Sequence, residues 1–136
     1  MNLQQFYKKY QGKIIDDWGI YNSDESKQMA RDFKSILRNG LSNQNAEIFG
    51  FKSNHYDFSG FVKINGDTLY ISYSIDRNRP TDLDRSDAMC GILIRHARDE
   101  KDYGGWHSRN NFCNFKNLFT KIANLFNEPK EIWFRA

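Results

Sequence analysis

Apolar and polar positions in the first forty residues alternate with the period of amphipathic helices. The apolar positions of the first predicted helix are Leu3, Phe6, Tyr7 and Tyr10. Gly12 ends this helix. A second helix is predicted after Ser23, which is a capping residue, and Gly40 follows its end. Its buried stripe consists of Met29, Phe33, Ile36 and Leu37, and its first turn carries the acidic residues Asp24 and Glu25.

Residues 46–77 change to the alternating pattern of β-strands. Asn65-Gly66 separates two alternating runs and predicts a two-residue type I′ turn, because both central residues of that turn need positive φ. The turn fixes the register of the hairpin. The predicted pairs on its apolar face are Ile64–Asp67, Val62–Leu69, Gly60–Ile71, Phe58–Tyr73 and Tyr56–Ile75. The helices are expected to cover this face.

The remaining pattern completes an α+β fold. Residues 89–97 form another strand candidate, and residues 112–126 return to helical spacing until Pro129 stops the helix. Residues 132–134 are predicted to add a short edge strand or to pack as a tail. We therefore expect a central antiparallel sheet of about four strands, with N-terminal helices and a C-terminal helix packed on one face. A length of 136 residues predicts a single domain.

The second face of the hairpin is polar and aromatic, and two interpretations of it stay open. Its predicted pairs are Lys63–Thr68, Phe61–Tyr70, Ser59–Ser72, Asp57–Ser74 and His55–Asp76. An antiparallel sheet commonly exposes one face to water, so this face can be purely structural. Alternatively, His55 and Asp76 form an acid–base pair, with Arg77 beside them, at the end of the hairpin away from the turn.

The segment from residue 95 to 111, RHARDEKDYGGWHSRNN, concentrates cations, rings and glycines between two apolar runs. Arg95 and His96 lie near a strand exit and point to opposite faces, and Asn111 or Asn114 is expected to cap the last helix. Free N–H groups at that helix start predict a seat for phosphate or carboxylate. Gly104-Gly105 are expected to precede this seat, with Lys101, His107 and Arg109 around it. The further binding residues expected in this segment are Arg95, Arg98, Tyr103, Trp106, Asn110 and Asn111. A solvated loop with internal ion pairs is the structural alternative.

Composition narrows these hypotheses only slightly. Aromatic residues make up 15% of the chain, about twice an ordinary share, so rings are expected in the core and on a surface. The net charge of +3 permits an anionic partner without requiring one. Cys90 and Cys113 share no metal-ligand spacing with a histidine, and they predict a reduced protein rather than a disulfide framework. We expect a cytoplasmic protein with no membrane span, no metal and no cofactor.

Three segments follow one another in this chain: DFSGFVKINGDTLYISYS, then ILIRHARDEKDYGG, then an asparagine-containing turn into a helix. This series resembles a group of small proteins carried by phages and conjugative elements of Gram-positive bacteria. The resemblance covers residues 58–126 and is most specific at Phe58-Ser59-Gly60-Phe61, Ile94-Arg95, Lys101-Asp102-Tyr103, Gly105 and Asn110-Asn111. Where the group more commonly has threonine, this chain has Gly104. Some proteins of this size and origin are similar in kind to anti-CRISPR inhibitors, which block an effector nuclease or damage its guide RNA.

Three functional hypotheses follow. The first is a mobile-element inhibitor that binds a CRISPR effector nuclease or its nucleic acid through Arg95, Arg98, Lys101, Tyr103, Trp106 and Arg109. The second is a metal-independent ribonuclease that truncates guide RNA, with His55 or His107 transferring protons. The third is a single-strand nucleic-acid-binding module without chemistry. Exposed sheet edges and spare aromatic residues also predict a homodimer.

Overall fold

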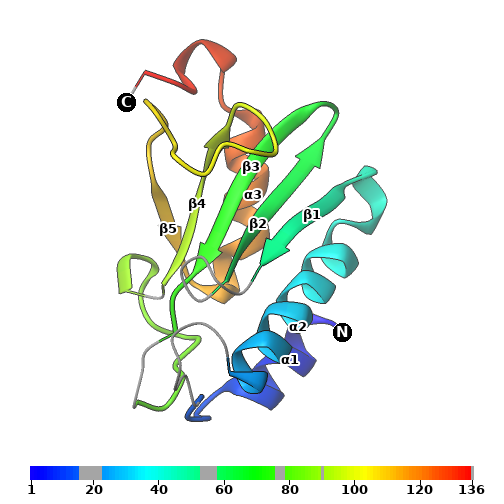
Figure 1. Cartoon of the computed structure of the whole chain (residues 1–136), viewed down its shortest axis with the longest axis vertical. Coiled ribbons are helices and arrows are strands. Elements are labelled where there is room, and N and C mark those ends of the chain that lie inside the picture. The colour runs from blue at the N-terminus through cyan, green and yellow to red at the C-terminus, as the bar shows by residue number, and fades with distance from the viewer. Residues whose placement is uncertain (16–22, 53–57, 76–78, 90, 136) are drawn as a thin grey trace.

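The computed structural model describes residues 1–15, 23–52, 58–75, 79–89 and 91–135. Within them the chain has the predicted α+β fold, with three α-helices and one antiparallel sheet (Figure 1). The helices are α1 (Leu3–Tyr10), α2 (Asp24–Gly40) and α3 (Leu118–Asn127). The strands are β1 (Glu47–Lys52), β2 (Phe58–Ile64), β3 (Asp67–Tyr73), β4 (Ile92–Ala97) and β5 (Asn111–Cys113). Short 3₁₀ turns are η1 (Ser42–Gln44), η2 (Asp87–Met89), η3 (Phe115–Asn117) and η4 (Lys130–Ile132).

The sheet has the order β1-β2-β3-β4-β5, so strands that follow one another in the chain are neighbours. The β2–β3 register agrees with the prediction at every described pair, from Ile64–Asp67 at the turn to Phe58–Tyr73 at the far end. Asn65 and Gly66 both have positive φ, as a type I′ turn requires. The pairs predicted beyond this point, which involve Tyr56, Asp57, His55 and Asp76, lie outside the described residues.

The sheet has five strands rather than about four, because residues 111–113 do not join the last helix. Asn111, Phe112 and Cys113 pair with Ile94, Leu93 and Ile92 of β4 and form the edge strand β5. The Asn114 side chain then accepts a hydrogen bond from the Asn117 N–H and caps η3, which leads into α3. The C-terminal residues pack as a tail rather than as a strand, with Trp133 only 6% exposed.

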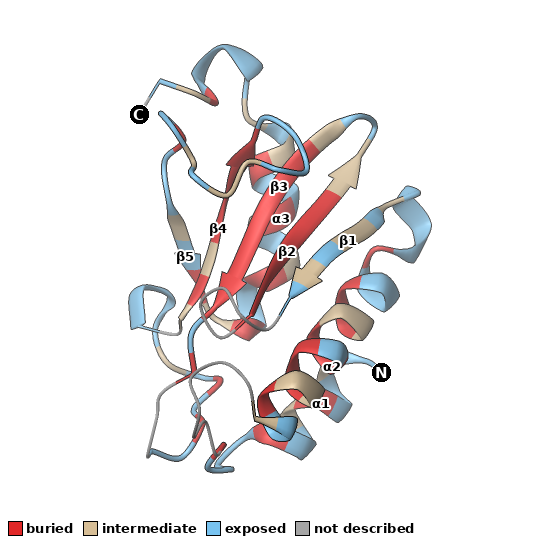
Figure 2. Ribbon diagram, in the orientation of Figure 1, coloured by how far each residue is buried: buried red, intermediate tan, exposed pale blue. Residues whose placement is uncertain are grey.

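All three helices contribute to one hydrophobic cluster on the apolar face of the sheet. Helix α2 contacts β1 and β2, and α3 contacts β3 and β4 (Figures 1 and 2). Aromatic rings form much of this core. Phe33 of α2 packs against Phe58 at 5.1 Å and meets Phe115 edge-on at 5.8 Å between ring centroids. Large rings in close contact bury more apolar area than aliphatic side chains, which offsets a moderate hydrophobic content.

The second face of the sheet is also covered, so it is not the wet face that alternation alone predicts. Ser59, Phe61, Tyr70 and Ser72 are all buried there. Phe61, Tyr70 and Ala97 form a smaller hydrophobic cluster, against which Tyr103 packs from the segment after β4. That segment folds back in front of the sheet in Figure 1. The central strands therefore have buried residues on both faces, as Figure 2 shows.

Helices α1 and α2 are joined by a polar contact centred on Asp32. Its carboxylate accepts hydrogen bonds from Tyr10 Oη at 2.5 Å, Lys9 Nζ at 2.7 Å and Gln28 Nε2 at 3.0 Å. Burial opposes ionisation of Asp32, but these three donors outweigh it, and the pKa of Asp32 lies below its ordinary value. Burial and the bond to Asp32 raise the pKa of Tyr10, so its hydroxyl stays protonated and donates.

The substitution Asp32→Asn is expected to lower the free energy of unfolding by about 1–2 kcal/mol at neutral pH, since it removes charge from three hydrogen bonds. The native pKa of Asp32 is depressed, so its contribution is complete above the unfolded-state value of about 4 and is lost as pH falls through the native value. The difference between wild type and variant should therefore shrink at pH 3. Urea denaturation at both pH values measures it, with the exposed Glu131→Gln as a control that changes little.

Two further observations concern the helices and the cysteines. None of the helices in the described ranges has both the length and the apolar character needed to cross a membrane. Cys113 is buried, and Cys90 lies outside the described residues.

Candidate binding loop and adjoining pocket

The binding loop, residues 98–110, connects β4 to β5 and is held in shape by Asp102. The Asp102 carboxylate accepts the N–H groups of Arg98 at 2.9 Å and Gly105 at 3.0 Å. The Asp99 carboxylate accepts the N–H of Lys101 at 2.8 Å. Short acidic side chains that bond backbone donors nearby stabilise turns. The acids of this segment therefore do more than cancel its positive charge, because they fix its backbone.

Arg95 lies beneath the binding loop and connects it to the sheet. Its side chain is 4% exposed, and its guanidinium is 4.2 Å from the centroid of the Tyr70 ring. Nη2 donates to the carbonyl of Asp102 at 2.7 Å, and Nη1 lies 3.8 Å from the Asp102 carboxylate. A Cβ at Gly105 would lie 2.6 Å from Arg95 Nε, so only glycine allows this close approach. The structure thus places Arg95 in a supporting position, away from the surface.

Tyr103 also points inward. Its ring meets Phe61 at 5.0 Å and Tyr70 at 6.0 Å, in both cases edge-on. Lys52 Nζ of β1 lies 3.8 Å from the centroid of the same ring, a distance typical of a cation–π contact. Tyr103 therefore anchors the binding loop to the second face of the sheet, and its side chain is half-buried.

Trp106 is the large side chain that the binding loop presents to solvent. It is 74% exposed, the highest value among the exposed large hydrophobic side chains of the described residues. His107, with φ 61°, places its ring edge-on to Trp106 at 4.9 Å. Arg98 donates to the carbonyl of Trp106, and its guanidinium lies 4.1 Å from the Phe134 ring of the C-terminal tail. An exposed indole is thus fixed next to cationic and aromatic neighbours.

The other predicted binding residues differ in exposure. Lys101, Gly104, Arg109 and Asn110 are exposed, and Asn111 is half-buried in β5. His55, Asp76 and Arg77 lie outside the described residues. The described part of the predicted set is therefore divided into an inner frame, made of buried Arg95 and half-buried Tyr103 and Gly105, and an exposed surface (Arg98, Lys101, Gly104, Trp106, His107, Arg109, Asn110).

The predicted anion seat at a helix start does not form in the binding loop. Helix α3 begins at Leu118, and β5 and η3 separate it from Gly104-Gly105. Asn114 lies before η3, and its N–H donates a hydrogen bond to the Asp87 carboxylate at 2.9 Å. The same carboxylate accepts a second hydrogen bond from the Asn117 side-chain amide at 3.1 Å. These donors hold the pKa of Asp87 below its ordinary value. An acid of the chain itself therefore occupies this position.

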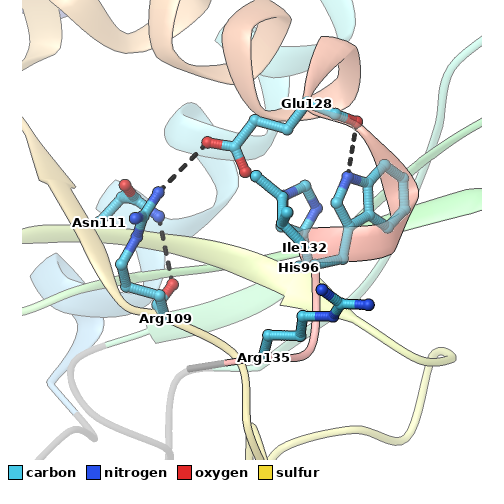
Figure 3. A pocket seen from close by; sticks show the side chains of 7 residues that line it. His96, Arg109, Asn111, Glu128, Ile132 and Arg135 are labelled. Atoms are coloured by element: carbon cyan, nitrogen blue, oxygen red, sulfur yellow. Dashed lines mark hydrogen bonds and ion pairs between the residues drawn. The ribbon is translucent and has the colours of Figure 1, made fainter.

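A pocket adjoins the binding loop, between the ends of β4 and β5 and the C-terminal tail (Figure 3). Its volume is about 290 Å³. Its lining residues are His96, Arg109, Asn111, Glu128, Ile132, Trp133 and Arg135. Glu128 is its central polar group, because one carboxylate oxygen lies 3.0 Å from His96 Nε2 and the other accepts from Arg109 Nη2 at 3.3 Å. Two residues predicted to bind, Arg109 and Asn111, are thus part of a concave site.

His96 is buried on the helix-covered side of the sheet, opposite to Arg95, as the alternation of β4 predicts. Its ring stacks on Trp133 with centroids 4.1 Å apart and an interplanar angle of 10°. Burial lowers the pKa of His96, although the hydrogen bond and the charge of Glu128 oppose this effect. Nδ1 is buried and has no hydrogen-bond partner in the described structure. His96 is therefore oriented by Glu128, and its burial favours the neutral imidazole.

Sequence reasoning missed His96, Glu128, Trp133 and Arg135 as members of one site. Glu128 and Trp133 lie more than thirty positions after His96 and are connected to it only by the packing of α3. One local signal was present. Pro129 predicts a chain reversal after the last helix, and a reversed tail carrying tryptophan and arginine returns toward the sheet.

The two described histidines stand in different surroundings, and the ribonuclease hypothesis stays a prediction, because His55 and Asp76 lie outside the described residues. Such a mechanism requires two accessible proton-transfer groups and a cation at one phosphate. His107 stands at the exposed tip of the binding loop, while Arg95 is enclosed beneath it. His96 has one ring nitrogen bonded to Glu128 and the other buried. Within the described ranges, no group of three His, Cys, Asp or Glu side chains has the geometry to hold a metal ion.

Comparisons of the chain with protein-family models, with curated proteins and with solved structures give no match. Functional inference therefore depends on the binding loop and the pocket.

Proposed function

We propose that this protein is a non-catalytic inhibitor that binds an effector nuclease of a host defence system through the surface of the binding loop. The observation that carries the proposal is Trp106, which is 74% exposed on a loop whose backbone is fixed by Asp102 and Arg95. Tryptophan and arginine dominate the binding energy of protein interfaces. Because the loop is already ordered, binding costs little conformational entropy.

The charges around Trp106 favour a protein partner over bare nucleic acid. The exposed cations Arg98, Lys101 and Arg109 are interspersed with exposed Asp99 and Glu100. Arg98 is paired with Asp102 at 3.7 Å, and Arg109 with Glu128 at 3.3 Å. Nucleic-acid-binding surfaces usually carry a one-sided positive patch. A mixed surface centred on an aromatic residue is typical of protein interfaces.

The resemblance to phage and conjugative-element proteins supplies the target class in this proposal. A mobile element that enters a bacterial cell meets defence nucleases in the cytoplasm, and a small protein that covers part of such a nuclease blocks it without any chemistry. The proposal therefore assigns the protein to the cytoplasm and its contact to a guide-loaded CRISPR effector. The assignment of a defence nuclease as the target is an analogy from mobile-element origin, and binding to a panel of effectors tests it directly.

Trp106→Ala is expected to weaken binding to its effector about thirtyfold, with no change in the free energy of unfolding, because the side chain is exposed. The assay measures inhibition of target cleavage and direct binding across a panel of guide-loaded effectors from Gram-positive bacteria, at physiological salt. Met89→Ala is the matched control, since Met89 is 64% exposed and lies in η2, outside the binding loop.

Three outcomes contradict the proposal. Equal loss of inhibition in the Met89 and Trp106 variants would remove the binding loop from the interface. Failure of the wild-type protein to bind or inhibit any effector in the panel would remove the target class. Shortening of guide RNA by the wild-type protein in excess chelator would instead support the ribonuclease hypothesis.

A further inference from the structure

The pocket of Figure 3 has the features of a ligand site beside the exposed surface of Trp106, and Arg109 belongs to both. Its volume of about 290 Å³ is near the lower limit of small-molecule sites, so it suits a ligand of the size of a single nucleotide. Its rim combines guanidinium groups, an amide and a carboxylate with the apolar side chains of Ile132 and Trp133. Apolar walls with a few converging polar groups are the usual composition of such sites.

The charges of the lining residues select an anion. Arg109 and Arg135 supply two positive charges, and Glu128 supplies one negative charge. Burial lowers the pKa of His96, which disfavours a positive charge on its ring. Glu128 is already bonded to His96 and Arg109 through its two oxygens, whereas Arg135 makes no ion pair within the described residues. The excess of positive charge therefore lies on Arg135 and the exposed Arg109, which reach the pocket from the C-terminal tail and from the chain before β5 (Figure 3).

We propose that this pocket binds the phosphate group of a nucleotide, with the phosphate between Arg109 and Arg135 and the base against Ile132. Guanidinium groups bind phosphate oxygens through paired N–H donors. The Asn111 amide, which donates to the Arg109 carbonyl at 3.1 Å, fixes the backbone from which Arg109 projects. Ile132 is 47% exposed, so its side chain offers an apolar surface for a planar base.

His96 and Glu128 position the site rather than contact the phosphate. The stack of His96 on Trp133 and the bond from Trp133 Nε1 to the Glu128 carbonyl at 2.8 Å hold the tail against the sheet. This attachment places Arg135 and Ile132 beside the pocket. Glu128 faces the same space with a negative charge, so it weakens phosphate binding while it orients Arg109.

The test is a titration of the full chain with adenosine 5′-monophosphate. Binding is monitored through the NMR signals of the Trp133 indole and the Asn111 side-chain amide. Adenosine and inorganic phosphate are titrated in parallel. We expect the monophosphate to shift both signals and adenosine to bind at least about tenfold more weakly, because it lacks the charge. Binding of inorganic phosphate with shifts at the same two signals would also support the phosphate site, with the base as a minor contact.

Variants separate a binding role from a structural one. Arg109→Gln and Arg135→Gln should each weaken binding of the monophosphate about tenfold. Arg38→Gln, at an exposed position of α2, should leave it unchanged. Glu128→Gln keeps a hydrogen-bonding side chain and removes the negative charge, so it should tighten binding about threefold. If Glu128 had only a structural role, its substitution would not tighten binding of the monophosphate.

The proposal is overturned if adenosine binds as tightly as its monophosphate, or if the pocket signals do not move with either phosphate compound. It is also overturned if Arg38→Gln weakens binding as much as the two pocket variants. None of these outcomes depends on an effector nuclease, so the pocket and the proposed inhibitory function succeed or fail separately.

Discussion

Arg95→Ala is expected to lower the free energy of unfolding by about 3–5 kcal/mol, the cost typical of removing one partner from a buried ion pair. Three contacts disappear together: the bond to the Asp102 carbonyl at 2.7 Å, the ion pair with its carboxylate and the contact with the Tyr70 ring. The side chain is 4% exposed, so water cannot replace them without opening the binding loop. Urea denaturation of wild type and variant measures the loss.

Arg98→Ala is the matched control for this prediction. Arg98 also pairs with Asp102, at 3.7 Å, but its side chain is 40% exposed. Exposed ion pairs contribute about 0–1 kcal/mol, so this variant should lose much less stability. If the two alanine variants were equally destabilised, burial would not be the reason for the effect, and Arg95 would not be the main anchor of the loop.

The same pair of variants separates supporting from contacting residues in the proposed interface. Arg95 was predicted from sequence to contact a partner, because it is a cation in a segment rich in cations and rings. In the structure it holds the loop that presents Trp106. Arg95→Ala should therefore reduce inhibition through disorder of the binding loop. Arg98→Ala should reduce inhibition through a lost surface contact, with the loop still in place.

Local rules predicted those parts of the fold in which a few adjacent residues determine the geometry. The Asn65-Gly66 turn specified all seven described pairs of β2 and β3, because a two-residue turn leaves one register. Ser23 capped α2 as expected, with its hydroxyl accepting the N–H of Ser26. The short strand β5 was not predicted, since Phe112 and Phe115 also have helical spacing and only the pairing with β4 decides between the two.

The candidate site could be predicted only as a segment. The sequence pointed to the binding loop, but the division into an inner frame and an exposed surface depends on contacts between distant residues. Tyr103 turns inward because Phe61 and Tyr70 offer a second apolar cluster on the face expected to be wet. The pocket joins β4 to a tail more than thirty residues later. Apart from the chain reversal that Pro129 predicts, no local pattern connects residues so far apart in the sequence.

Gly105→Ala is the second large effect, with an expected loss of about 2–4 kcal/mol. Gly105 has φ +67°, where a residue with a Cβ is strained. The new Cβ would also lie 2.6 Å from Nε and 2.9 Å from Cζ of Arg95. An arginine side chain at a surface could move aside, but this one is buried and bonded to Asp102. The binding loop must shift instead, and inhibition should fall with stability.

Gly104→Ala, one position earlier, provides the control. A Cβ at Gly104 meets nothing within 4 Å, and this glycine is exposed and is not among those with positive φ. Its substitution should change stability by less than about 0.5 kcal/mol. Denaturation midpoints of the two variants therefore test whether the Gly-Gly pair is a generic turn or a specific contact. Equal effects would indicate a generic turn, whereas a loss confined to Gly105 would show that the guanidinium of Arg95 is what requires the glycine.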